Sequence, residues 1–173
     1  MVMTTAAGVD VAGQVYDFVK ESNAIEGIHR DPTDDELEAT VAFLDLEKVT
    51  VAHMEVLVQC YAGAPLREKF GQNVRVGSHF PPRGGPLVRK DLMDLLKAAH
   101  SVGRSSTTPG TRPYLVHQRY EQLHPFMDGN GRSGRTLWYW QMKRQEQWRL
   151  LDLGFLHAWY YASLAEYPGR GGS

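Results

Sequence analysis

Apolar residues recur every three or four positions along most of this chain, and that spacing limits its fold more than any other feature. One series follows Thr33, which has Glu36 three residues later, as in a capping box. The series predicts one long amphipathic helix from about residue 34 to residue 62, ended by Gly63 and Pro65. Further series predict helices over residues 92–99, 116–123 and 156–164, and one that begins within residues 129–135 and continues through Met142. We therefore expect a mainly α-helical fold.

Composition agrees with one globular unit. The 173 residues are 42% hydrophobic and 23% charged, so we expect a single domain over residues 1–173 with a disordered tail around 168–173. The one cysteine, Cys60, excludes an internal disulfide and an all-thiolate metal site. No apolar run has the length of a membrane helix, and no Lys or Arg precedes Lys20 as in a signal peptide. We expect a cytoplasmic protein with no membrane partner.

Charge is distributed unevenly along the chain. Residues 1–50 carry eleven acidic and three basic side chains, a local net charge of −8, whereas the whole chain has a net charge of −1. The basic remainder favours a phosphorylated ligand, and the acidic segment could fold across this basic part of the protein. The alternative is that these acids only open a solvated helix, where the helix dipole favours them. Nothing in the bulk charge indicates binding to nucleic acid.

The chemistry of the sequence is concentrated in the segment LHPFMDGNGRSGR. Glycines 129 and 131 permit close approach of the backbone, and N–H groups at the following helix start form an anion site. Arg132 and Arg135 supply paired donors that match phosphate oxygens. Asp128 is an oxygen ligand suited to Mg²⁺, and His124 can accept a proton at neutral pH. Together these residues predict a phosphate-transfer site.

Two other interpretations of this segment are open. The spacing from Gly129 to Thr136 fits a P-loop with Arg in place of Lys, as in a regulatory module that binds nucleotide without transferring it, but no apolar strand precedes it. A divalent-metal hydrolase could use His117, His124 and Asp128, although these spacings form no recognised ligand set and leave the arginines unexplained. Both interpretations account for fewer of the residues than phosphate transfer does.

The same residues resemble the Fic signature, HxFx[DE]GNGRxxR, and the likeness extends from about residue 20 to residue 165. This resemblance implies a Fic-type helical core with a small β-hairpin flap. It also implies a protein adenylyltransferase, which moves AMP from ATP to a Ser, Thr or Tyr hydroxyl of a target protein. Transfer of another phosphate-containing group remains an alternative. The flap residues that would dock the target main chain are Val76, Gly77, Ser78 and His79.

The resemblance also implies a role for each residue of the signature. His124 would deprotonate the target hydroxyl, Phe126 would anchor the loop in the core, and Asp128 would hold Mg²⁺ against the phosphates. The expected nucleotide-binding residues are Asp128, Gly129, Asn130, Gly131, Arg132, Ser133, Gly134, Arg135, Tyr160 and Tyr161.

A second motif precedes the core. The segment SNAIEG, with Ser22, Glu26 and Gly27 at its defining positions, resembles the family's inhibitory motif [ST]xxxE[GN] on a helix around residues 14–27. Glu26 would pair with Arg135 and remove the cation that should hold the γ-phosphate. In some relatives the same Glu promotes removal of AMP from modified targets, so both directions stay open. The alternative is an ordinary helix end capped by Gly27. A homo-oligomer is compatible with the sequence.

Overall fold

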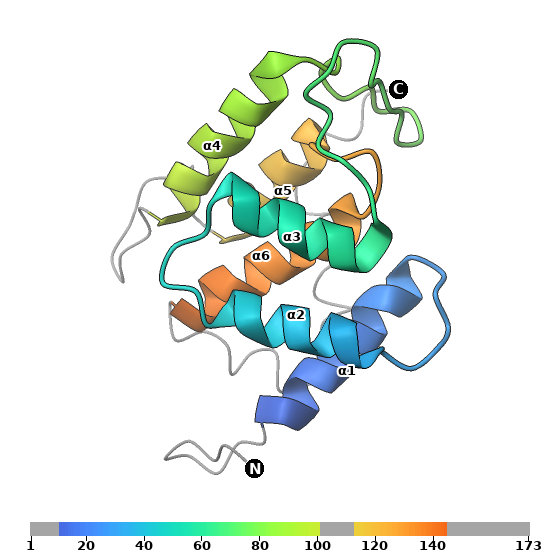
Figure 1. Ribbon diagram of the computed structural model, residues 1–173, viewed down its shortest axis with the longest axis vertical. Coiled ribbons are helices and arrows are strands. Elements are labelled where there is room, and N and C mark those ends of the chain that lie inside the picture. Colours follow the sequence, from blue (N-terminus) through green and yellow to red (C-terminus); the bar gives the residue numbers. More distant parts are fainter. Residues whose placement is uncertain (1–10, 101–112, 145–173) are drawn as a thin grey trace.

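Six helices make up the part of the chain that the computed structural model describes, residues 11–100 and 113–144 (Figure 1). They are α1 (Val11–Ile25), α2 (Asp34–Leu44), α3 (Val51–Ala62), α4 (Pro86–His100), α5 (Pro113–Leu123) and α6 (Asn130–Arg144). The mainly α-helical fold is therefore confirmed. The predicted helix at 156–164 and the tail lie outside the described residues. No helix within the described ranges is both long and apolar enough to cross a membrane.

The prediction of one long helix is wrong, because residues 45–50 separate α2 from α3. Side chains from distant parts of the sequence form hydrogen bonds with the backbone of residues 45–50. The indole N–H of Trp140 donates to the carbonyl of Leu46 at 2.8 Å, and the N–H of Val49 donates to Nε2 of His100 at 2.8 Å. These contacts satisfy backbone groups that a continuous helix would have bonded internally. Tertiary structure thus overrides an apolar periodicity that runs through the break.

Local signals set the helix ends that the sequence predicted. Thr33 caps α2, and its side chain and that of Glu36 form the expected capping box. Gly63 ends α3 in the left-handed conformation, with φ 61°. Thr50 caps α3 in the same way that Thr33 caps α2. The capping of α3 by Thr50 is the local feature that the sequence analysis missed.

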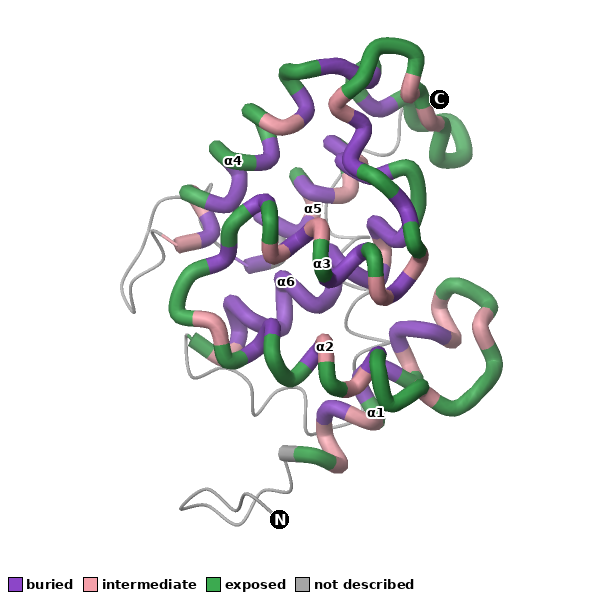
Figure 2. The backbone as a smooth tube through the Cα atoms, in the orientation of Figure 1, coloured by how far each residue is buried: buried purple, intermediate pink, exposed green. Residues whose placement is uncertain are grey.

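Helix α6 is the centre of the core. It packs against α5, α2, α3 and α1, and nearly every residue from Asn130 to Met142 is buried (Figure 2). Trp140 and Leu137 have no exposed surface. A helix packed on all sides cannot shift along its axis without disturbing its neighbours. The N-terminus of α6, where the glycine-rich segment begins, is therefore held in a fixed position.

The connection between α3 and α4 contains the segment predicted as a β-hairpin. Val76 and His79 form an antiparallel bridge, in which the N–H of each donates to the carbonyl of the other at 3.0 and 2.9 Å. Gly77 lies in the turn with φ 58°. The bridge is isolated, and no strand extends from it within the described residues. The predicted hairpin is thus not confirmed, and we call residues 73–81 the flap.

Candidate active site

His124 lies directly after α5 and turns the chain out of that helix. Its N–H still donates to the carbonyl of Tyr120 at 2.8 Å, but its φ of 47° is left-handed. This conformation costs a non-glycine residue about 1 kcal/mol or more, so the surrounding structure must hold it. The imidazole is largely buried, with 17% of the side chain exposed.

The electrostatics around His124 favour the neutral imidazole. Burial is the main reason that its pKa lies below the ordinary histidine value, and electrostatic interactions with Arg67 and His79 act in the same direction. Contact with the backbone of Glu121 and the charge of Glu26 oppose the shift. The group can therefore accept a proton at neutral pH.

Hydrogen bonds between the side chain of Asn130 and the backbone of Phe126 fix the loop that follows His124. The N–H of Phe126 donates to Oδ1 of Asn130 at 2.8 Å, and Nδ2 of Asn130 donates back to the carbonyl of Phe126 at 2.8 Å. Phe126 is fully buried and forms an antiparallel bridge with Leu66. The aromatic ring thus anchors the loop, as the sequence predicts, and the side chain of Asn130 is committed to holding the loop's shape.

The loop leads into the N-terminus of α6 through Gly129. Its φ is 76°, and a Cβ at this position would lie 2.9 Å from Cβ of Ala62, so both conformation and space require glycine. Asp128 is exposed, and its Oδ1 accepts from the N–H of Gly129 at 2.6 Å. The first N–H groups of a helix have no acceptor within that helix. This terminus therefore offers oriented donors and positive dipole charge to an anion.

Arg132 lies beside this terminus and is nearly buried. Its guanidinium is 5.6 Å from the centre of the Tyr61 ring, and Nη1 is 3.7 Å from Oε1 of Glu36. Its Nε is buried without a hydrogen-bond partner among the described residues. A buried donor of this kind favours an oxygen ligand.

Arg135 is bound by Ser22 of α1 and by Glu26 in the turn after it. Its Nε donates to Oγ of Ser22 at 2.8 Å, and its Nη2 donates to the Ser22 carbonyl at 2.9 Å and to Oε1 of Glu26 at 2.7 Å. Arg135 is 1% exposed, whereas the Glu26 side chain is 40% exposed. Helix α1 ends at Ile25, so Glu26 and Gly27 lie in the turn after it, with Gly27 at φ 77°. The structure thus brings together the two motifs of the sequence.

Other predicted site residues have different surroundings. The Ser133 hydroxyl is buried and bonded to the Gly129 carbonyl and to Oη of Tyr120, and its N–H also donates to Gly129. Gly134 packs against α5, where an added Cβ would collide with Tyr120 and Glu121. These residues hold α5 against α6. Tyr160 and Tyr161 lie outside the described residues.

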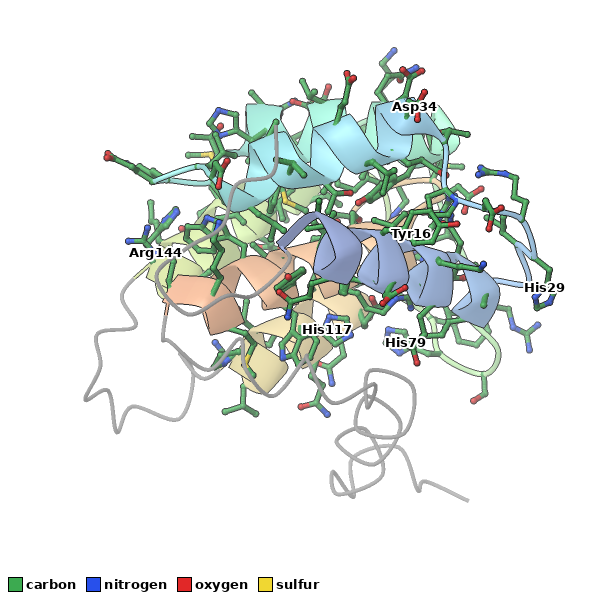
Figure 3. The ribbon with its side chains drawn as sticks, turned by 90° about the horizontal axis from the view of Figure 1, so that it is seen from below. Tyr16, His29, Asp34, His79, His117 and Arg144 are labelled. Carbon is green, nitrogen blue, oxygen red and sulfur yellow. The ribbon has the colours of Figure 1, made fainter. Side chains whose placement is uncertain are left out.

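The flap is attached to the end of α5 beside His124. Nε2 of His79 is 2.9 Å from the carbonyl oxygen of Gln122, and Figure 3 shows His79 on its loop at the edge of the helical bundle. Ser78 is exposed and Val76 is 38% exposed. The flap residues are therefore accessible next to the imidazole.

The structure weakens both alternative interpretations of the motif. A P-loop needs a strand before its glycines, but the helix α5 precedes them. A metal hydrolase needs clustered ligands, and no group of three or more His, Cys, Asp or Glu side chains suited to a metal occurs in residues 11–100 and 113–144. One carboxylate, Asp128, agrees with how Mg²⁺ binds beside substrate phosphates, because that ion takes one or two protein ligands there.

The sequence did not predict a role for Arg67 at this site, and it predicted only part of the role of Glu36. Arg67 donates to the carbonyl of His124 at 2.6 Å from a position 57 residues away. Glu36 was expected only as a helix cap, but it also binds Arg30, at 2.8 Å, and approaches Arg132. No spacing rule connects Arg67 with His124, or Glu36 with Arg132, because the two residues of each pair lie far apart in the chain.

More than half of the 173-residue chain matches a known protein family. Residues 43–142, which run from the end of α2 nearly to the end of α6, match the Fic/DOC family. The chain belongs to the Fic/DOC family. The matched region contains His124, the glycine-rich turn and both arginines, but not the Glu26 motif.

Several curated relatives are each named protein adenylyltransferase Fic. That of Drosophila willistoni is 33% identical over 104 residues, which cover 58% of this chain and 19% of the relative. That of Drosophila virilis is 32% identical over 96 residues, covering 54% and 18%. That of Drosophila melanogaster is 33% identical over 95 residues, covering 54% and 18%. The chain therefore spans about a fifth of the length of these relatives.

Proposed function

We propose that this Fic-family chain is a protein adenylyltransferase that moves AMP from ATP to a Ser, Thr or Tyr hydroxyl of a target protein. The observation that carries the proposal is the position of a largely buried imidazole in the loop that leads into a helix N-terminus with two arginines. Curated relatives named protein adenylyltransferase support the same reaction.

In the proposed reaction, His124 takes the proton of the target hydroxyl as its oxygen attacks the α-phosphorus of ATP. A new oxygen–phosphorus bond forms, the bond from the α-phosphorus to the bridging oxygen breaks, and pyrophosphate leaves. The N-terminus of α6 and Arg132 stabilise charge on the phosphates. Asp128 would hold Mg²⁺, which neutralises phosphate charge when it is bound.

The contact of Glu26 with Arg135 supports a second part of the proposal, namely that the chain inhibits itself. Arg135 is the arginine three residues after Arg132, and its guanidinium is occupied by Ser22 and Glu26. In this state it cannot bind a γ-phosphate, and the Glu26 carboxylate repels one. ATP would then bind with its α-phosphorus poorly aligned for attack.

The test is incubation with ATP and Mg²⁺, followed by mass spectrometry for an adenylate increment on Ser, Thr or Tyr. A Glu26→Gly protein should be labelled from α-labelled ATP, and the double variant with His124→Ala should not. His29→Ala in the same Glu26→Gly protein is the matched control for His124→Ala and should leave the labelling unchanged. His29 is exposed and lies on the turn after α1. Transfer of a γ-label instead would show phosphate transfer and contradict the proposal.

A further inference from the structure

Arg67 is a fully buried arginine whose side chain binds only backbone carbonyl groups. It lies in the short segment between α3 and the flap and has no exposed surface. Its guanidinium donates to the carbonyls of His124 at 2.6 Å, Leu123 at 2.8 Å, Pro82 at 2.9 Å and Gln72 at 3.1 Å. No carboxylate of the described residues forms an ion pair with it.

The four carbonyl groups belong to two structures that the proposed reaction must bring together. Leu123 is the last residue of α5 and His124 follows it directly, at the end of the helix where the dipole places negative charge. Gln72 and Pro82 stand on either side of the flap, so Arg67 closes the base of the flap as well. The guanidinium of Arg67 therefore binds both the backbone of the proposed base, His124, and the two ends of the flap that would hold the target.

The backbone of Arg67 also links the segment after His124 to the segment after the flap. Its N–H donates to the carbonyl of Pro125 at 2.8 Å, next to His124, and its carbonyl accepts from the N–H of Gly85 at 3.0 Å, beyond the flap. Leu66 pairs with Phe126 in the same stretch. The segment containing Leu66 and Arg67 thus pairs in antiparallel fashion with the loop of residues 124–129, which we call the catalytic loop.

On the basis of the proposed function, we propose that Arg67 is a positioning residue that sets the distance and orientation between the flap and His124. A target main chain docked on the flap would then present its hydroxyl to the imidazole in the required geometry. Arg67 itself touches neither the nucleotide nor the target.

The chemistry of the side chain supports positioning over simple packing. A guanidinium has five donors in a planar fork, so it can reach both pairs of carbonyls, whereas a lysine ammonium is a compact charge that reaches one of them. A buried cation without a carboxylate carries a desolvation cost that an apolar side chain would avoid. Filling space alone would therefore not require an arginine here.

Gly84 offers a second way to disturb the same contact. A Cβ at this position would collide with the carbonyl oxygen of Gln72 and lie 2.8 Å from that of Lys69. Gly84→Ala should therefore displace the Gln72 carbonyl that Arg67 binds, while the guanidinium itself is unchanged. This variant tests the proposal even if Arg67→Lys does not fold.

The experiment compares Arg67→Lys and Gly84→Ala in the Glu26→Gly background. We expect kcat for AMP transfer to a target protein to fall about 10- to 100-fold, as for a misplacement of about 1 Å, with affinity for ATP unchanged within about twofold. Arg89→Lys is the matched control, because Arg89 binds Glu55 and Glu68 at the surface. Unchanged kcat, or an equal loss of ATP affinity, would overturn the proposal.

Amide hydrogen exchange provides a measurement that does not depend on activity. In Arg67→Lys, the N–H of His79 in the flap and that of Met127 in the catalytic loop should both exchange faster, because each is bonded within a structure that Arg67 holds. Faster exchange in only one of the two segments would contradict a coupling role. If both segments loosen but Glu26→Gly transfers no AMP, the proposed function fails while the coupling stands.

Discussion

Nη2 of Arg135 lies 2.7 Å from Oε1 of Glu26, although 109 residues separate the two in the chain. The contact joins the turn after α1, within the acidic residues 1–50, to α6 at the centre of the core. A Cβ added at Gly131 would collide with the same Glu26 oxygen, so a larger residue there would displace the carboxylate from its present position. The charge asymmetry of the sequence thus has one specific structural consequence at the candidate site.

Removing the Glu26 carboxylate should increase AMP transfer. We expect Glu26→Gly to raise the rate on the order of tenfold, corresponding to about 1.4 kcal/mol, because Arg135 becomes available to the nucleotide. Glu26→Gln should give a smaller increase, since its amide oxygen can still accept from Arg135. The rate is measured with α-labelled ATP, and Glu38→Gln on the exposed face of α2 is the control. Equal rates for Glu26→Gly and wild type would refute inhibition by this contact.

Ser22 should contribute to inhibition through its hydroxyl. Ser22→Ala removes the acceptor of Arg135 Nε but leaves the bond to the Ser22 carbonyl. We expect partial activation and a decrease of about 1 kcal/mol in the free energy of unfolding, measured by urea denaturation. Activation without any change in stability would be compatible with this view. Full stability together with wild-type activity would show that the hydroxyl contributes to neither.

The pH dependence of the reaction should report the environment of His124. Because burial lowers its pKa below 6.5, the imidazole remains neutral, and active as a base, at pH values where an ordinary histidine is protonated. The acid limb of kcat/KM in Glu26→Gly should therefore have a midpoint below 6.5. Loss of Glu26, whose charge opposes the shift, should lower it further. A midpoint at or above 6.5 would exclude His124, as placed here, from the role of base.

Glu36 should make the free energy of unfolding depend on pH in the acid range. A hydrogen bond from Arg30 is the main reason that the pKa of Glu36 falls from 4.5 to about 2. Its contribution is fully present above pH 4.5 and is lost as the pH falls from there toward 2. Glu36→Gln should remove on the order of 3 kcal/mol at pH 7 and flatten this dependence. Glu38→Gln is the control, and an identical acid transition in both variants would contradict the assignment.

Much of the fold could be predicted because its signals are local. The capping box at Thr33, the left-handed Gly63 and the start of α6 within the glycine-rich segment each depend on residues within a turn of one another. The break between α2 and α3 could not be predicted in this way, because its backbone is bonded to Trp140 and His100. Apolar periodicity predicts which face of a helix is buried, but it does not predict such long-range hydrogen bonds.

The sequence by itself determined the chemical groups of the site, because base, acidic ligand, glycine turn and arginines are contiguous from His124 to Arg135. It also supplied, through a family resemblance, the pairing of Glu26 with Arg135. Only the tertiary structure decided that Ser133 faces α5 and that Arg67 joins the flap to His124. The physical reason is that a side chain's partners depend on which helix faces it, and helix packing is a property of the whole core.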